Sequence, residues 1–275
     1  MALMSVATTS TVAISKTNNP HLQLNNISRL VVFGDSYSDN GNTYRLTQHL
    51  LPLSPPYYKG RFTDGPMWNE YLINLLNRSS KNKTRLTNYA FGSGMVLKSN
   101  IVTLDADNGK KTFHIPSLSQ EVFLYTTDPS HNLDQTLFVL YMGSVDLALM
   151  PEGTDESAFM KQVLNTVLAQ IQRLIGEDAK HIIVFNIHDF TRAPIWTSRA
   201  NAYAQKHTNV TADEYLNKRR KLIQQYNIAL REALRDIPQA HYFDINALFA
   251  EVFNTVLEKK EYLYETKNKA SAITN

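Results

Sequence analysis

The sequence predicts an α/β fold, a three-layer α/β/α sandwich with a mostly parallel five-stranded sheet. Short apolar runs alternate with longer amphipathic segments, which is the pattern of strands joined by crossover helices. The run over 136–143 is apolar throughout, as expected of a strand covered on both faces. No internal repeat or low-complexity linker divides the pattern, so the sequence predicts a single domain over 29–257.

The individual elements follow from local signals along the chain. Strands are predicted over 29–34, 85–90, 136–143, 181–187 and 241–245. Helices are predicted over 43–51, from Pro66 onward, over 117–125, 156–175 and 212–236, and then through 257. Two capping boxes mark helix starts, one pairing Ser117 with Gln120 and the other Thr211 with Glu214.

The remaining segments are predicted to be irregular. The stretch 97–115 is polar and indicates a surface loop or hairpin, and the segment containing Pro194 and Trp196 indicates a loop. A disordered or loosely packed lead-in is expected over 1–28 and a loose tail over 258–275.

Composition excludes several classes of function. The formal charge of +3, with no run of Lys or Arg, gives no sign of a nucleic-acid partner. The chain has no cysteine, which excludes disulfides, thiolate catalysis and cysteine-based zinc sites. No apolar stretch is long enough for an integral membrane segment. We expect no cofactor and no metal, and the oligomeric state stays open.

The compartment also stays open. The segment 1–15 is mildly apolar but has no basic n-region, so it is a poor match to a signal peptide. Glycosylation sequons at Asn26, Asn77, Asn82 and Asn209 would fit a secreted protein, although such short patterns also arise by chance.

The stretch Leu30–Asn42 carries the strongest chemical signal. It begins as an apolar run that suits one buried strand and then breaks into Gly, Asp, Ser and Asn, the residues typical of turns. A serine at the end of a buried strand lies at the rim of a sheet with its hydroxyl exposed. Backbone N–H groups of the next helical turn then point toward whatever the hydroxyl attacks. Ser36 is therefore the candidate nucleophile.

The block Phe33–Asn42 resembles the nucleophile block of the GDSL (SGNH) family of ester hydrolases. Two later segments resemble the family in the same order, Gly60–Leu72 and the second block Asn88–Gly94. The resemblance covers roughly Arg29 to Phe253 and implies an SGNH hydrolase-like, flavodoxin-like fold. It also implies a small-molecule or polymer ester as substrate, either lipid-like or an acetylated carbohydrate.

The resemblance further implies an oxyanion hole, the set of N–H donors that stabilises the tetrahedral intermediate. Its donors would be the N–H of Ser36 and that of Gly92 or Ser93. The family's third block supplies an asparagine side chain, but here the block reads Gly143-Ser144-Val145-Asp146. Valine cannot donate a hydrogen bond, and loss of one such donor typically costs on the order of 100- to 1000-fold in rate.

The family's catalytic base comes from an Asp-x-x-His block, and this sequence has no histidine after His241. Two Asp-x-x-His strings occur earlier, Asp128 to His131 and Asp178 to His181. Both stand out of family order, and we treat them as coincidental. His188 follows a predicted strand at the same edge as Ser36 and is the candidate replacement base, although a solvent-facing or loop-packing role is the simpler interpretation.

Three hypotheses for the function remain open at this stage. The chain could be an ester hydrolase with Ser36 as nucleophile, impaired as written. It could be a catalytically inactive relative that binds an acyl or glycan ligand. It could also be a truncated gene product, although truncation does not explain Val145, because that residue is internal.

Overall fold

A computed structural model describes residues 27–79, 83–127, 135–207, 209–259, 261–266 and 269–274. Its central sheet confirms the predicted five strands, and every pairing in it is parallel. The strand order is β2-β1-β5-β6-β7. The strands are β1 (Arg29–Gly34), β2 (Arg85–Asn88), β5 (Thr136–Tyr141), β6 (His181–Phe185) and β7 (Ala240–Phe243).

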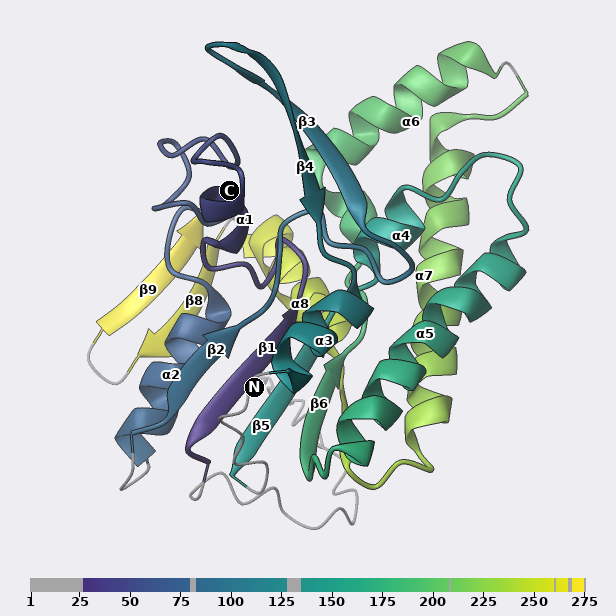
Figure 1. The fold of residues 1–275 in the computed structure, drawn as a ribbon. Coiled ribbons are helices and arrows are strands. Elements are labelled where there is room, and N and C mark those ends of the chain that lie inside the picture. The colour runs from purple at the N-terminus through teal and green to yellow at the C-terminus, as the bar shows by residue number, and fades with distance from the viewer. Residues whose placement is uncertain are drawn as a thin grey trace, which may run out of the picture.

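Helices cover both faces of this sheet, which gives the predicted three layers (Figure 1). One face carries α3 (Leu118–Thr126), α5 (Glu156–Gly176) and α7 (Ala212–Leu234), and the other carries α2 (Trp68–Ser79) and α8 (Ile245–Lys259). Successive side chains of β1 alternate between two apolar cores. Val31 and Phe33 lie in the core under α3, α5 and α7, and Leu30 and Val32 lie in the core under α2.

The strand order sets the position of the functional edge. From β1 the chain moves to β2 on one side and then to β5 on the other, so the order reverses between β1 and β5. Ligands of open parallel sheets bind beyond the carboxyl ends of the strands at such a reversal. The segments that follow β1 and β5 therefore occupy the expected position, and they contain Ser36 and Val145.

The predicted loop around Pro194 and Trp196 is wrong, because this segment forms α6 (Pro194–Lys206). Pro194 occupies the first helical turn, where the missing N–H has no intrahelical partner to lose. Two short helices also differ from expectation, since α1 covers only Asn42–Leu46 and α4 (Ser144–Ala148) was not predicted. The capping boxes at Ser117 and Thr211 are both confirmed.

Two hairpins lie outside the sandwich. The expected surface hairpin is formed by β3 (Asn100–Ala106) and β4 (Gly109–Ile115) and projects from the carboxyl edge of the sheet (Figure 1). Where the sequence predicts a loose tail, β8 (Glu261–Thr266) and β9 (Lys269–Thr274) pair as an antiparallel hairpin. Tyr, Thr and Ile in these two segments favour strands despite their charged neighbours.

The predicted lead-in before Ile27 and the string Asp128 to His131 lie outside the described residues. Within the part of the chain that the structure describes, every helix is too short or too polar to cross a membrane.

Candidate active site

Ser36 lies immediately beyond the carboxyl end of β1, in a tight helical turn. The carbonyl of Asp35 accepts hydrogen bonds from the N–H groups of Ser38 and Asp39, both at 3.0 Å. Gly34 permits this turn, because a Cβ at that position would lie 2.6 Å from the carbonyl oxygen of Tyr141. Ser36 itself is half-buried, so its hydroxyl is held by the fold and still reaches open space.

The carboxylate of Asp39 fixes the far end of this turn. Its Oδ1 accepts from the N–H groups of Gly41 at 2.7 Å and Asn42 at 2.6 Å. Its Oδ2 accepts from Thr43 at 3.0 Å and Gly92 at 2.9 Å. One buried side chain thus ties the nucleophile block to the second block.

The two candidate donors of the second block point in different directions. The N–H of Gly92 is directed at Asp39 Oδ2 and at Thr43 Oγ1, 2.7 Å away. Ser93 has a φ of 67°, a left-handed conformation that is uncommon for serine, and lines a cavity together with Ser36. Of the two predicted donors, Ser93 is therefore the one that the fold leaves at the cavity.

The third block reaches the same cavity. Gly143 has a φ of +116° and turns the chain from β5 into α4, so that Val145 lines the cavity of about 230 Å³ that contains Ser36 and Ser93. The valine thus lies where the family resemblance places an asparagine donor. Its neighbour Ser144 donates from Oγ to Asp35 Oδ2 at 2.7 Å, which couples the third block to the nucleophile turn.

The cavity also contains Asn100, which the sequence did not single out. Its side-chain Nδ2 donates to the carbonyl of Ser93 at 2.9 Å, on the peptide that follows the candidate donor. Arg199 lies on the opposite element, α6, with its guanidinium 4.9 Å from the ring centre of Trp196. Both residues come from segments whose position against the sheet is not readable from local patterns.

A second cavity begins on the other side of the serine. It has a volume of about 430 Å³ and shares Ser36 and Tyr37 with the first. Its other walls are largely aromatic and apolar and include Phe62, Met67 and Trp68. Ser36 therefore stands on the boundary between two cavities.

Two buried acids accept hydrogen bonds from the backbone of the Ser36 turn. Asp35 is fully buried, and this burial raises its pKa to about 6, although the hydrogen bond from Ser144 opposes the change. Glu121 accepts from the N–H of Gly34 at 2.9 Å, and burial raises its pKa well above the ordinary value. Both groups are positioned to hold backbone and are remote from open solvent.

His188 follows β6 as predicted but is only 3% exposed. Its Nδ1 lies 2.7 Å from the hydroxyl of Tyr141, and its Nε2 has no hydrogen-bond partner within the described residues. Burial lowers the imidazole pKa to about 4, so the ring is neutral at pH 7. The ring of Tyr37 packs edge-on against it at 4.2 Å. Tyr37 lines both Ser36 cavities, whereas His188 lines neither.

Asp178 and His181, one of the strings treated as coincidental, flank the amino end of β6. They lie at the opposite edge of the sheet from Ser36, because the strands are parallel. Among the residues with described placement, no group of three or more His, Asp or Glu side chains has the arrangement of a metal site.

The fold and the site together define a class. A serine at a strand end, held by a turn at the reversal point of a parallel sheet, is an arrangement that also occurs in hydrolases that attack through a serine. Comparison with known proteins agrees. The chain belongs to the GDSL-like lipase/acylhydrolase family, whose model matches residues 30–269.

Individual relatives are similar at lower identity. A phosphatidylcholine-sterol acyltransferase from Aeromonas hydrophila is 29% identical over 225 residues, which cover 82% of this chain and 60% of the relative. An inactive GDSL esterase/lipase-like protein 25 from Arabidopsis thaliana is 26% identical over 260 residues, covering 88% and 60%. The secreted effector protein SseJ from Salmonella typhimurium is 27% identical, covering 63% and 38%. The chain thus spans at most 60% of the length of these relatives.

Proposed function

We propose that this chain carries the nucleophile side of an ester-hydrolase site, with Ser36 as the attacking residue. The observation that supports it most directly is that Ser36, Ser93 and Val145, which come from three separate blocks of the sequence, line one cavity. The substrates proposed are carboxylic esters, either lipid-like or acetylated carbohydrates. The named relatives include a phosphatidylcholine-sterol acyltransferase, which supports an acyl ester.

The proposed reaction has two stages. Ser36 Oγ loses its proton to a base and forms a bond to the carbonyl carbon, and the N–H groups of Ser36 and Ser93 hold the resulting oxyanion. Collapse breaks the ester C–O bond, and the alcohol leaves with the proton that the base received. Water then attacks the acyl-serine by the same route and releases the carboxylic acid.

Ser36 needs a base that takes its proton. The base could come from residues beyond the present sequence, from another chain, or from His188. For His188, neutrality at pH 7 is favourable, because a base must be unprotonated. Its burial is unfavourable, because a proton moving from Ser36 to its Nε2 would have to pass the ring of Tyr37, which packs against the imidazole.

A second candidate function is binding without turnover. Val145 at the expected asparagine position favours it, because the cavity then has one fewer donor for an oxyanion. The similarity to a relative named inactive is consistent with this alternative. The ligand would be the same acyl or glycan ester.

A fluorophosphonate probe tests the proposal, since it labels serines that are activated as nucleophiles. We expect labelling of the wild-type chain and of Ser157→Ala, which alters an exposed serine on α5, and none of Ser36→Ala. Turnover of p-nitrophenyl butyrate should follow the same order. Equal labelling of Ser36→Ala and wild type would contradict the proposal, and absence of labelling in all three proteins would favour binding without turnover.

A further inference from the structure

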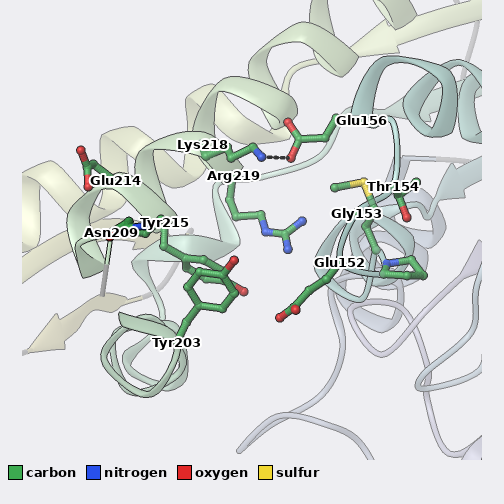
Figure 2. Close-up of a pocket in the computed structure, with 13 residues that line it drawn as sticks. Glu152, Gly153, Thr154, Glu156, Tyr203, Asn209, Glu214, Tyr215, Lys218 and Arg219 are labelled. Carbon is green, nitrogen blue, oxygen red and sulfur yellow. Dashed lines mark ion pairs between the residues drawn. The ribbon is translucent and has the colours of Figure 1, made fainter. Parts of the chain in front are cut away.

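A third cavity, which we name the Tyr203 pocket, lies between the α4–α5 connection and the facing ends of α6 and α7 (Figure 2). Its volume is about 440 Å³. It adjoins the Ser36 cavity along two walls. Leu149 lines the Ser36 cavity and Met150 lines the Tyr203 pocket, while on α6 Arg199 lines the first and Tyr203, one turn later, lines the second.

The two tyrosines of this pocket belong to a row of contacting side chains. The ring of Tyr203 stacks on that of His207 at 4.1 Å between centroids and meets the tilted ring of Tyr215 at 4.6 Å. The guanidinium of Arg219 lies over the ring of Tyr215, 5.3 Å from its centre. Figure 2 shows both tyrosine hydroxyl ends turned toward the space between Arg219 and Glu152. A ligand in this space therefore meets phenol O–H groups, which both donate and accept hydrogen bonds.

The pocket is lined by three acids and two bases, and the carboxylate of one acid, Glu214, is turned away from the space between Arg219 and Glu152 (Figure 2). Lys218 pairs with Glu156 at 3.0 Å, and Glu214 accepts from the N–H of Thr211 at 2.8 Å in its capping box. What remains is one acid, Glu152, and one base, Arg219, on opposite walls (Figure 2). Glu152 is weakly paired with His207 at 4.0 Å, and Arg219 Nη1 donates to the carbonyl of Leu147 at 3.3 Å, so each keeps further hydrogen-bonding atoms.

This set of groups selects among ligand classes. An acyl chain would desolvate the carboxylate, the guanidinium and the phenols without giving them partners, which is costly. An anion would face Glu152 and a cation would face Arg219. A neutral group with many hydroxyls satisfies all of them, because each hydroxyl can donate to the carboxylate or accept from the guanidinium.

We propose that the Tyr203 pocket binds a neutral, hydroxyl-rich group such as a sugar residue, as a distal subsite for the ester substrate. Its role as a subsite rests on the proposed function, because it depends on chemistry at Ser36. Binding of the sugar itself does not. The sugar could belong to a free glycan or to the headgroup of a glycolipid, since both present the same hydroxyls.

The test measures binding of maltotriose, xylotriose and triacetylchitotriose by isothermal titration calorimetry and saturation-transfer NMR. We expect at least one to bind the wild-type chain. The double variant Tyr203→Phe/Tyr215→Phe keeps the stacked rings and removes only the hydroxyls. It should weaken binding by about tenfold, the effect of losing two ordinary hydrogen bonds. Glu152→Gln should also weaken binding, and Tyr71→Phe, an exposed tyrosine on α2, should not.

Further binding measurements distinguish the alternative ligands. Vesicles of phosphatidylcholine with and without digalactosyldiacylglycerol distinguish a glycolipid headgroup from a free glycan. Stronger binding of glycerophosphocholine or inorganic phosphate than of any sugar would overturn the proposal, as would failure of all the sugars or unchanged affinity in the Phe variants. Ser36→Ala should bind the sugar as wild type does, so a failed nucleophile and a failed sugar site give different results.

Discussion

The two sides of the Ser36 turn hold their buried polar side chains in opposite ways. On the side of the second block, the carboxylate of Asp39 accepts four backbone N–H bonds from Gly41, Asn42, Thr43 and Gly92. On the side of β5 and β6, Tyr141 and His188 are buried against each other, and the Nε2 of His188 lacks a partner among the described residues.

The difference shows that one edge of the sheet can combine a firmly hydrogen-bonded turn with buried titratable groups. The first side stabilises a charge by surrounding it with fixed dipoles, so its geometry is firmly set. The second side keeps its titratable groups uncharged through burial, which lowers the pKa of His188 and raises that of Tyr141. Variants on the two sides should therefore differ in kind, the first in stability and the second in dependence on pH.

The largest expected effect is at Asp39. Asp39→Ala leaves the N–H groups of Gly41, Asn42 and Thr43 without their acceptor and removes one of two acceptors from that of Gly92, and we expect a loss of about 3–5 kcal/mol in the free energy of unfolding. Urea denaturation measures it. Asp107→Ala, at the exposed tip of the β3–β4 hairpin, is the matched control and should stay within about 0.5 kcal/mol of wild type. Similar losses in the two variants would show that the N–H contacts of Asp39 do not stabilise the Ser36 turn beyond an ordinary surface position.

The next effect is a pair of opposite pH dependences. Asp35 has a folded pKa of about 6 against an ordinary 3.8, so its folded form binds a proton more tightly and it contributes stability below about pH 4 that is lost as pH rises through 6. His188 has a folded pKa of about 4 against 6.5, so the stability it contributes at neutral pH is lost as pH falls from 6.5 through 4. Each change is on the order of 3 kcal/mol, and in the wild type the two oppose each other.

Removing either group should therefore reveal the pH dependence of stability that the other group contributes. Asp35→Asn should make the chain lose more stability than wild type between pH 7 and pH 4, whereas His188→Gln should make it lose less. Unfolding free energies from urea curves at the two pH values give the comparison. Parallel pH profiles for wild type and both variants would show that burial does not shift the pKa values of these two groups.

A smaller effect is expected at Val145. Val145→Asn adds an amide donor to the Ser36 cavity and should increase the rate of fluorophosphonate labelling by about tenfold or more. Val145→Leu adds bulk without a donor and should not accelerate labelling. Acceleration by both variants would mean that size, rather than hydrogen bonding, limits the reaction at this position.

The smallest effect is expected at Asn100. Asn100→Ala removes the hydrogen bond to the carbonyl of Ser93, and we expect labelling to slow by about two- to tenfold, the worth of one ordinary hydrogen bond. Asn108→Ala, at the tip of the same hairpin, serves as the control. An unchanged rate in Asn100→Ala would show that the backbone of Ser93 is oriented without this contact.

The sequence was sufficient to predict the sheet and the edge at which the three blocks lie, because both depend on where the strands end, which local signals indicate. An apolar run followed by a glycine-containing turn specifies a strand and its end, and parallel strands bring their ends to one edge. Ser36, Gly92 and His188 could therefore be assigned to one edge from the strand ends, and the family resemblance added Ser93 and Val145.

Features that depend on tertiary packing were not predictable in this way. The α6 segment buries mainly Trp196 and Ala200, so its apolar spacing is too sparse to indicate a helix. Asn100 reaches the Ser36 cavity because of where the β3–β4 hairpin sits on the sheet, which no local pattern encodes. The burial of His188 likewise comes from distant residues, including Phe249 of α8, stacked on the imidazole at 5.0 Å.

The position of Ser36 on the boundary of two cavities has a consequence for the order of events. The two halves of an ester lie on opposite sides of its carbonyl carbon, so each half can have a chamber of its own. In the proposed reaction, the departing alcohol would leave one cavity while the acyl group, bound to the serine, still filled the other. Whichever molecule entered the emptied cavity next, water or a second alcohol, would decide whether the acyl group was released or transferred.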